Sequence, residues 1–215
     1  RNKIGMPYKY IKDDIFKEHR VEHQLRILNE LSCKYDKDNA KPSIVGVDLG
    51  HVIKKFPIKD DYIVVCPTNS HVSNKNHRGY RSWPDSNWKD LIRRVLSEPS
   101  LNIILVGSKN EKEYFNTFYP LKERTYDLSG QTTIPELITI MKNSKCVITT
   151  DSGSAHIAGA SAKNIISIHG PTNFYQSAPY RTKYNDVKVA TLNLKCSPCY
   201  DTESIKKCKK NICMQ

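Results

Sequence analysis

The residues from Asp151 to His156, in the order Asp-Ser-Gly-Ser-Ala-His, form the densest group of side chains in the sequence that could handle an anion. Ser152 and Ser154 are natural helix N-caps, and Gly153 lets the backbone approach a ligand closely. Free N–H groups at a helix start attract negative charge, as does the helix dipole, and His156 lies about one turn further on. Asp151 would repel that anion unless its carboxylate accepts hydrogen bonds from sugar hydroxyls or loop amides. The pattern predicts an anion site; the alternative is an ordinary capped turn against which His156 packs.

The elements around this loop alternate between short apolar runs and amphipathic stretches. An apolar run closed by Pro or Gly indicates a buried strand, whereas apolar residues three or four apart indicate a helix. The predicted strands are 63–66, 103–106, 146–150, 165–168 and 187–190, and the predicted helices are 21–31, 84–97, 111–119, 134–141 and 154–161.

One predicted helix start carries a complete capping signature. Thr133 and Glu136 form a Thr-x-x-Glu capping box, and Pro135 stands in the first turn, where its missing N–H costs nothing. We therefore expect a well-defined helix here, with Leu137 and Met141 on its buried face.

Strands and helices in this alternation predict right-handed βαβ crossovers and a parallel sheet. The fold expected from about residue 44 onward is a Rossmann-like α/β domain, and the polar stretch 34–42 before it is expected to be a linker or loop. In such sheets, ligands bind at the carboxyl ends of the strands beside helix N-termini. Asp151 follows the strand 146–150 at such a position.

The composition fits a globular chain with a basic surface. The 215 residues include 34 Lys and Arg against 22 Asp and Glu, a formal net charge of +12, and 38% are hydrophobic. A basic surface attracts phosphate-bearing partners such as nucleic acid, anionic lipid and nucleotide diphosphates, or it reflects a Lys-rich genome. Because the lysines are scattered and no RNA-binding motif accompanies them, nucleic acid is not an expected partner. No apolar run reaches the ~18–20 residues that a membrane helix needs.

Five motifs in the same order resemble those of one family. Two of them resemble the signature of glycosyltransferase family 9, the ADP-heptose:lipopolysaccharide heptosyltransferases. These are the stretch 151–158 and, after the next strand, Gly170-Pro171-Thr172. Arg81-Ser82-Trp83-Pro84 resembles that family's basic-x-Trp-Pro motif, and 127–133 resembles its Leu-x-Gly-x-Thr turn. The cysteine-rich tail, 196–213, resembles the end of the family pattern. Each motif is weak alone, but together they span roughly residues 63–215.

The resemblance implies a GT-B fold, in which two Rossmann-like domains face each other across a cleft. Residues 1–43 would be the end of the N-terminal acceptor domain plus a linker, and residues 44–215 the C-terminal domain that binds the nucleotide-sugar donor. The family's acceptor loop and its proposed general base have no counterpart in the sequence. Because the sequence opens on Arg1 rather than Met, we expect it to be a piece of a longer product.

The family's donor-binding residues match five positions around the diphosphate. Asp151, Ser152, Gly153 and His156 match residues that hold the donor's diphosphate and sugar. Arg81 matches a lysine placed against the diphosphate, and it would offer a planar fork of donors instead of a point charge.

Three further matches concern the rest of the donor. Glu111 matches an acidic residue that takes the ribose hydroxyls, Thr132 lies where a loop contacts the nucleoside, and Thr68 follows a strand that faces the phosphates. When a nucleoside diphosphate leaves, negative charge grows on it, so hydrogen-bond donors aimed at that charge help most in the transition state. Arg81 and His156 are therefore the expected catalytic residues, and no metal ion is required.

The cysteine-rich tail raises a separate question about metal. Four cysteines have spacings that suit a structural metal site with four thiolate ligands: Cys196-x₂-Cys199-x₈-Cys208-x₄-Cys213. The alternatives are free thiols or disulfide-paired thiols. Five lysines in and beside the tail would lower the pKa values of these thiols or offset the charge of a four-thiolate centre: Lys195, Lys206, Lys207, Lys209 and Lys210. The remaining cysteines lie in apolar contexts and are expected in the core: Cys33, Cys66 and Cys146.

The resemblance thus predicts an inverting glycosyltransferase that transfers a sugar, heptose by family analogy, from a nucleotide-diphosphate donor such as ADP-heptose to a lipopolysaccharide-type glycan. The alternative is a nucleotide-sugar-binding module without transferase activity of its own, because the acceptor half is missing. The expected location is the cytoplasm, with peripheral contact at the inner membrane.

Overall fold

A computed structural model describes residues 17–35, 42–56, 58, 60–69, 79–118, 123–200 and 202–215. The predicted linker at 34–42 and the predicted N-terminal segment 1–43 lie partly outside these residues.

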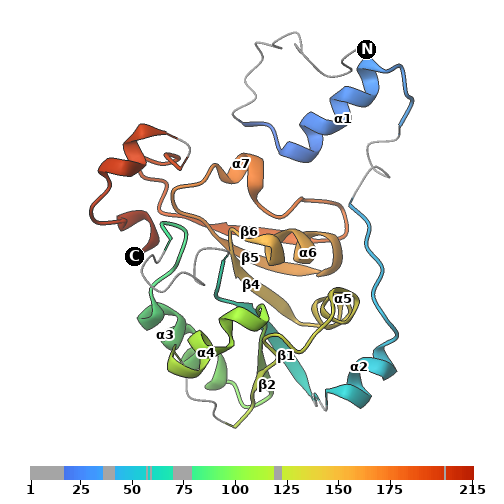
Figure 1. The fold of residues 1–215 in the computed structure, drawn as a ribbon. Helices are drawn as coiled ribbons and strands as arrows, with labels where there is room; N and C mark the ends of the chain where they lie inside the picture. The colour runs from blue at the N-terminus through green and yellow to red at the C-terminus, as the bar shows by residue number, and fades with distance from the viewer. Residues whose placement is uncertain are drawn as a thin grey trace.

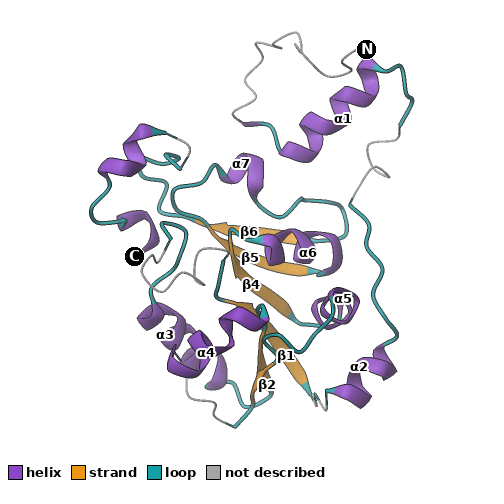
Figure 2. Cartoon of the chain, in the orientation of Figure 1, coloured by secondary structure: helices purple, strands orange, loops and turns teal. Residues whose placement is uncertain are grey.

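A parallel sheet forms the centre of the molecule (Figures 1 and 2). Over the described residues it has six strands in the spatial order β3-β2-β1-β4-β5-β6, and every neighbouring pair is parallel. This is the strand order of a doubly wound Rossmann-type sheet, so the predicted fold is confirmed. The strands are β1 (Asp61–Cys66), β2 (Leu101–Leu105), β3 (Thr125–Asp127), β4 (Cys146–Thr150), β5 (Asn164–Ile168) and β6 (Asp186–Ala190).

Helices cover both faces of the sheet. The described helices are α1 (Arg20–Glu30), α2 (Leu49–Lys55), α3 (Asp85–Leu96), α4 (Lys112–Phe118), α5 (Ile134–Lys142), α6 (Gly153–Ser161) and the single turn α7 (Phe174–Ser177). The sequence predicted α1, α3, α4, α5 and α6 to within a few residues. It did not predict α2, α7 or β3, which are short and carry few buried residues.

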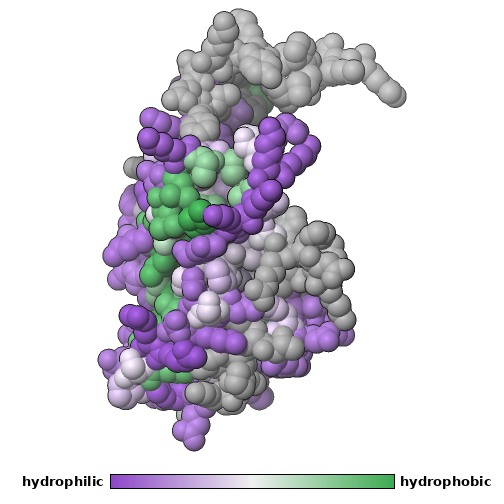
Figure 3. Space-filling model, turned by 90° about the vertical axis from the view of Figure 1, so that its left-hand side faces the viewer, coloured by the Kyte–Doolittle hydropathy of each residue, from purple (hydrophilic) through white to green (hydrophobic). Residues whose placement is uncertain are grey.

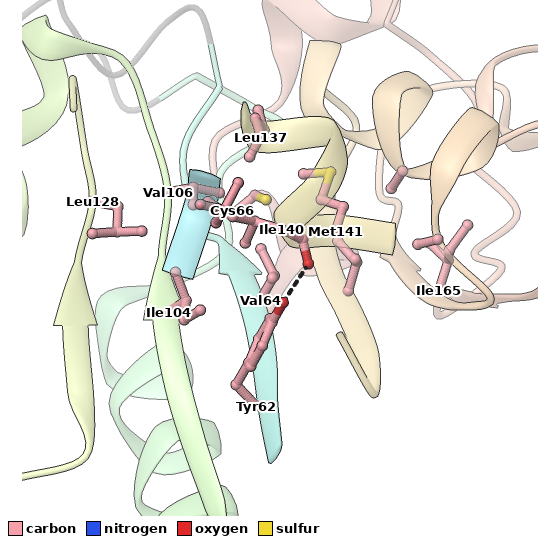
Figure 4. Close-up of a cluster of buried hydrophobic side chains, with 14 of the residues drawn as sticks. Tyr62, Val64, Cys66, Ile104, Val106, Leu128, Leu137, Ile140, Met141 and Ile165 are labelled. Carbon is pink, nitrogen blue, oxygen red and sulfur yellow. Dashed lines mark hydrogen bonds between the residues drawn. The ribbon is translucent and has the colours of Figure 1, made fainter. Parts of the chain in front are cut away.

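Successive side chains of a strand point to opposite faces of the sheet, so the core is divided into two clusters. On one face, Val64 and Ile104 pack with residues of α2, α5 and α6, and on the other, Val65 and Ile103 pack with α3 and α4. Figure 4 shows the first cluster, in which the Tyr62 hydroxyl donates a hydrogen bond to the Ile140 carbonyl at 2.9 Å. Burial raises the pKa of Tyr62 to about 12, so this donor keeps its proton.

The cysteines predicted for the core differ in their surroundings. Cys66 is buried at the end of β1, as predicted, and burial raises the pKa of its thiol to about 12. Cys146 is half-buried. The prediction was wrong for Cys33, which is exposed in the turn after α1, whose last residue is Glu30.

α1 docks on the sheet domain through polar contacts on the segment after α7 (Figure 1). The His19 ring Nε2 lies 2.8 Å from the Ala178 carbonyl oxygen, and the Tyr180 hydroxyl donates to Glu22 at 2.5 Å. The His19 and Tyr180 rings also touch, with centroids 5.0 Å apart. Burial lowers the pKa of His19, so the ring stays neutral and can donate one hydrogen bond to the carbonyl.

The predicted capping box at the start of α5 is present and has two further partners. Thr133 N donates to Glu136 Oε2 at 2.8 Å, and Glu136 N donates to Thr133 Oγ1 at 3.4 Å. Lys55 Nζ lies 2.8 Å from Glu136 Oε1, and His51 Nε2 lies 3.1 Å from it, so α2 is tied to α5. Hydrogen bonding, first of all from Lys55, holds the pKa of Glu136 at about 2.

Glu136→Gln should destabilise the fold because Gln keeps the shape of the side chain but loses its charge. We expect a loss of about 1–2 kcal/mol at pH 7, the sum of a weakened cap and weakened charge-assisted hydrogen bonds. A folded pKa of about 2, against an ordinary 4.5, means that the carboxylate's contribution is complete above pH 4.5 and is lost as the pH falls toward 2. Urea unfolding at several pH values should show the difference between variant and wild type shrinking below pH 4.5. Glu113→Gln, at an exposed position of α4, is the matched control, and a difference independent of pH would contradict this account.

Candidate functional site

The strand order reverses between β1 and β4, and the segments that follow these two strands meet at the edge of the sheet. The Thr150 hydroxyl, at the end of β4, donates to the Thr68 carbonyl at 3.3 Å. Both side chains are buried, at 5% exposure for Thr68 and 0% for Thr150. Such a reversal leaves a crevice at the carboxyl ends of the strands, because the connecting helices depart to opposite sides.

The loop from Asp151 to His156 leads from β4 into α6, as predicted. Ser152 is the N-cap residue, but its side chain makes no capping hydrogen bond and instead lies 3.4 Å from the Thr149 hydroxyl. The prediction that Ser154 caps the helix was wrong, because it lies within the first turn. Since the first amides of a helix have no intrahelical acceptor, the missing side-chain cap leaves the α6 N-terminus able to bind an anion.

Gly153 faces open space at this helix start. Apart from its chain neighbours and the backbone of its own helix, a Cβ built on Gly153 would meet no atom of the described residues within 4 Å, and the backbone is not in the left-handed region. Neither packing nor backbone conformation therefore requires glycine here. An alanine at this position would thus fit without displacing a neighbouring side chain.

Arg81 is the cation that faces this loop. Its Nη1 donates to the Asp151 backbone carbonyl at 3.2 Å and lies 3.6 Å from Asp151 Oδ2. The Arg81 side chain is 18% exposed and that of Asp151 is 8% exposed, so the pair is largely shielded from water. The repulsion expected between Asp151 and an anion is thereby reduced, because the carboxylate is partly neutralised by Arg81.

A cavity of about 300 Å³ joins these groups. Five of the predicted site residues line it: Arg81, Asp151, Ser152, Gly153 and His156. Six further lining residues were not predicted as site residues: Arg20, Thr172, Asn173, Gln176, Ser177 and Tyr200. Arg20 comes from α1 and Tyr200 from the tail, and neither belongs to a recognisable local motif. The others follow Gly170-Pro171, which the sequence had marked as part of a motif.

The remaining predicted site residues do not line this cavity. Thr68 is buried beneath the end of β4. The Glu111 carboxylate accepts a hydrogen bond from Ser108 N at 2.5 Å and is 9% exposed, so it caps the turn before α4. Thr132 precedes the cap of α5 and is partly buried. The predicted contacts of Thr68 with the phosphates, and of Glu111 and Thr132 with the nucleoside, remain predictions.

His169 supports the cavity wall from beneath. It is 1% exposed, with Nε2 2.9 Å from the Ser167 hydroxyl and Nδ1 3.2 Å from the Thr172 hydroxyl. Burial lowers the pKa of His169, so a neutral ring connects β5 to Thr172. His169 is therefore a positioning residue for Thr172 and has no access to a ligand.

The tail packs on the segment that carries Thr172. Ser197 Oγ donates to the Gly170 carbonyl, and the amides of Cys199 and Tyr200 both donate to the Pro171 carbonyl, at 2.8 and 2.9 Å. Met214, just after the tail, is 1% exposed and would collide with a Cβ on Gly170. Figure 3 shows the side of the molecule on which the tail lies, where hydrophilic residues surround a band of hydrophobic ones.

The four tail cysteines line one cavity of about 320 Å³. Within the part of the chain that the structure describes, no three His, Cys, Asp or Glu side chains are grouped so that they could hold a metal ion. Burial, and next the neighbouring thiols, raise the pKa values of Cys199 and Cys213. The expectation that lysines lower them was wrong for these two residues, because the lysine heads are exposed to solvent.

The comparison with known families decides what kind of domain carries this cavity. The model of "Glycosyltransferase family 9 (heptosyltransferase)" matches residues 7–210. The chain belongs to glycosyltransferase family 9. Its fold, strand order and predicted motifs are those of a family 9 domain.

Individual family 9 relatives match only in part. Lipooligosaccharide heptosyltransferase 2 of Campylobacter jejuni serotype O:6 is 34% identical over 119 residues, which are 54% of this chain and 37% of that protein. The structure of E. coli ADP-heptose LPS heptosyltransferase II superposes with a TM-score of 0.60 at 20% identity, covering 76% of this chain and 52% of that one. The E. coli heptosyltransferase WaaC with ADP gives a TM-score of 0.53 at 21% identity, covering 86% and 54%. The chain thus spans about a third to a half of the length of these relatives.

Gly153→Ala separates ligand binding from folding. Since a Cβ at position 153 meets no protein atom, and Ala favours a helix over Gly by up to about 1 kcal/mol, thermal unfolding should stay at the same temperature or rise slightly. The added methyl group would occupy space where Gly153 lines the cavity. We expect anion affinity to fall by about fivefold, or about 1 kcal/mol. Calorimetry measures both quantities, and unchanged affinity would place the ligand away from this glycine.

Proposed function

We propose that this chain is the donor-binding domain of an inverting, metal-independent glycosyltransferase that uses a nucleotide diphosphate-sugar. The observation that carries the proposal is the cavity at the β1–β4 reversal, where Arg81 and the uncapped start of α6 face the same space. By analogy with the family, the transferred sugar is heptose, the donor is ADP-heptose, and the acceptor is a lipopolysaccharide core or a similar glycan.

The charges around the cavity suit a diphosphate. Arg20 and Arg81 bring two positive charges and Asp151 one negative charge, and the N-terminus of α6 adds positive potential. A nucleotide diphosphate-sugar carries about two negative charges. The positive groups therefore outweigh the negative charge of Asp151, which favours binding of the donor. They would favour the departing nucleoside diphosphate more strongly, because it carries more negative charge than the donor.

Each predicted catalytic residue has a specific role in this proposal. Arg81 is oriented by Asp151 and presents its guanidinium to the diphosphate as the bond to the sugar breaks. His156 lies in the first turns of α6, exposed to the cavity, and donates a hydrogen bond to the same group. Asp151 keeps carboxylate lone pairs for a sugar hydroxyl while it holds Arg81. The general base that deprotonates the acceptor would come from the acceptor domain.

The alternative function is a nucleotide-sugar-binding module without transferase activity. The same cavity supports it, because donor binding needs only the residues described above. Transfer by a longer protein that includes an acceptor domain would favour the enzyme, and donor binding without transfer by that protein would favour the module.

The proposed setting is the cytoplasmic side of the inner membrane, where the enzyme would meet a lipid-linked acceptor. Within the described residues, no helix is long and apolar enough to span a bilayer. A net charge of +12 would attract the protein to an anionic membrane surface.

Nucleotide titration tests the proposed function directly. Isothermal calorimetry with ADP, UDP, GDP, ADP-heptose and other nucleotide sugars should give saturable binding of at least one of them, with ADP-heptose the expected donor. His156→Ala should weaken this binding by about tenfold, or about 1.4 kcal/mol, and leave thermal unfolding unchanged because the side chain is exposed. Asp151→Ala should weaken binding by a similar factor, since it removes the carboxylate that lies 3.6 Å from Arg81 Nη1 and that is proposed to accept from a sugar hydroxyl, although the backbone carbonyl bonded to Arg81 stays.

The control for these variants is His23→Ala, at an exposed position of α1. It should bind nucleotide as the wild type does. Failure of every nucleotide to bind at millimolar concentration would refute both the enzyme and the module. Equal losses of thermal stability in the Asp151 and His156 variants would instead indicate that the loop is an ordinary structural turn.

We further propose that the tail binds one structural zinc or iron ion. Supporting it are the four thiols around one cavity and the contribution that neighbouring thiols make, after burial, to the raised pKa values of Cys199 and Cys213. Thiols that raise one another's pKa resist ionising together, and a divalent cation removes that repulsion when it binds thiolates. In the structure, the described cysteines do not lie close enough together to hold a metal ion. Metal binding would therefore require the four thiols to move closer to one another.

Metal analysis of protein purified without chelator should find close to one equivalent of zinc or iron. A variant with Cys196→Ser and Cys199→Ser should lose the ion, whereas Cys33→Ser, at an exposed position before the domain, should keep it. Less than about a tenth of an equivalent in the wild type would refute metal binding and leave free or paired thiols.

A further inference from the structure

Tyr200 connects the tail to the proposed donor cavity. Its ring lies beneath the Arg81 guanidinium, with the guanidinium carbon 5.0 Å from the ring centroid, and it lines the same cavity. The family motifs in the sequence marked the cysteines on this segment, but they gave Tyr200 no role.

The backbone of Tyr200 is fixed to the segment after β5. Its amide donates to the Pro171 carbonyl at 2.9 Å, beside the Cys199 amide, which donates to the same oxygen at 2.8 Å. Ser197 adds a hydrogen bond to the Gly170 carbonyl. Three contacts within four residues thus hold the backbone that carries the Tyr200 ring in place.

Arg81 is therefore oriented from two sides. The Asp151 backbone carbonyl accepts a hydrogen bond from Arg81 Nη1 at 3.2 Å. On the other side, the Tyr200 ring packs against the guanidinium, whose carbon lies 5.0 Å from the ring centroid. An arginine carries many rotamers, so a side chain fixed by both a hydrogen bond and an aromatic face loses less freedom when it binds a ligand. Removing either support should lower the fraction of time that Arg81 faces the cavity.

We propose that Tyr200 is a positioning residue of the donor site, which holds Arg81 toward the diphosphate through its ring. The tail is then one wall of the donor site. This inference rests on the proposed function for the identity of the ligand, but the contact between Tyr200 and Arg81 can be tested without a ligand.

A double-mutant cycle with ADP-heptose and ADP as probes tests the role in binding. Tyr200→Phe retains the ring and should bind within about twofold of the wild type, whereas Tyr200→Leu should bind about five- to tenfold more weakly. In an Arg81→Ala background, Tyr200→Leu should cost less than about twofold, because the residue it positions is gone. An equal cost in both backgrounds, or a loss of affinity in Tyr200→Phe, would overturn the proposal.

Tyr184→Leu is the matched control. It removes an exposed ring that also carries a cation, Lys183 at 5.4 Å from the ring centroid, and that lies outside the proposed donor cavity. This variant should bind both probes as the wild type does.

NMR of the Arg81 side chain distinguishes failure of this inference from failure of the proposed function. In the wild type, the Nε–Hε signal of Arg81 should show ring-current displacement that persists in Tyr200→Phe and disappears in Tyr200→Leu. If no nucleotide binds but the signal responds in this way, the positioning role stands and the donor function fails. If nucleotide binds but the signal is the same in all three proteins, the positioning role fails.

Discussion

The reversal of strand order between β1 and β4 is the constraint on which the site depends. Helices that follow strands on the two sides of this point leave in opposite directions, so the carboxyl ends of β1 and β4 are not covered by a crossover. The central strands β1, β2 and β4 are largely buried, and the two segments leaving β1 and β4 are joined by the hydrogen bond from Thr150 to the Thr68 carbonyl.

An anion site that contains a carboxylate needs compensation, and the structure supplies it by pairing Asp151 with Arg81. Because both side chains are largely buried, their interaction is screened less by water and salt than that of a surface pair. The pairing leaves Asp151 partly neutralised while the guanidinium retains donors for a ligand. Under the proposed function, one pair of residues would serve both the charged diphosphate and the neutral hydroxyls of a sugar.

Much of the fold could be predicted from the sequence because its signals are local. Four residues fix the start of α5, since Thr133 and Glu136 satisfy each other's backbone amides, and the apolar run before Asp151 can only be a buried strand. The sequence could not show that Glu136 also binds Lys55 and His51, because α2 approaches from about eighty residues away. For the same reason, Arg20 and Tyr200 escaped prediction: each reaches the cavity from a distant segment. Ser152 is the N-cap residue, as predicted, but the sequence could not show that its hydroxyl lies beside the Thr149 hydroxyl and makes no capping hydrogen bond.

The cavity therefore depends on two segments outside the alternating pattern of the domain. Arg20 lines it only while α1 stays docked, and that docking rests on polar contacts of His19 and Glu22 with the segment after α7. Polar contacts at a partly exposed seam contribute less than apolar burial, so this wall is held more weakly than the loop after β4. The tail wall differs, because Met214 is buried against Gly170 and Tyr200 is bonded to Pro171. Of the two arginines, Arg81 is thus built into the domain, whereas Arg20 belongs to the part of the chain that leads toward the proposed acceptor side.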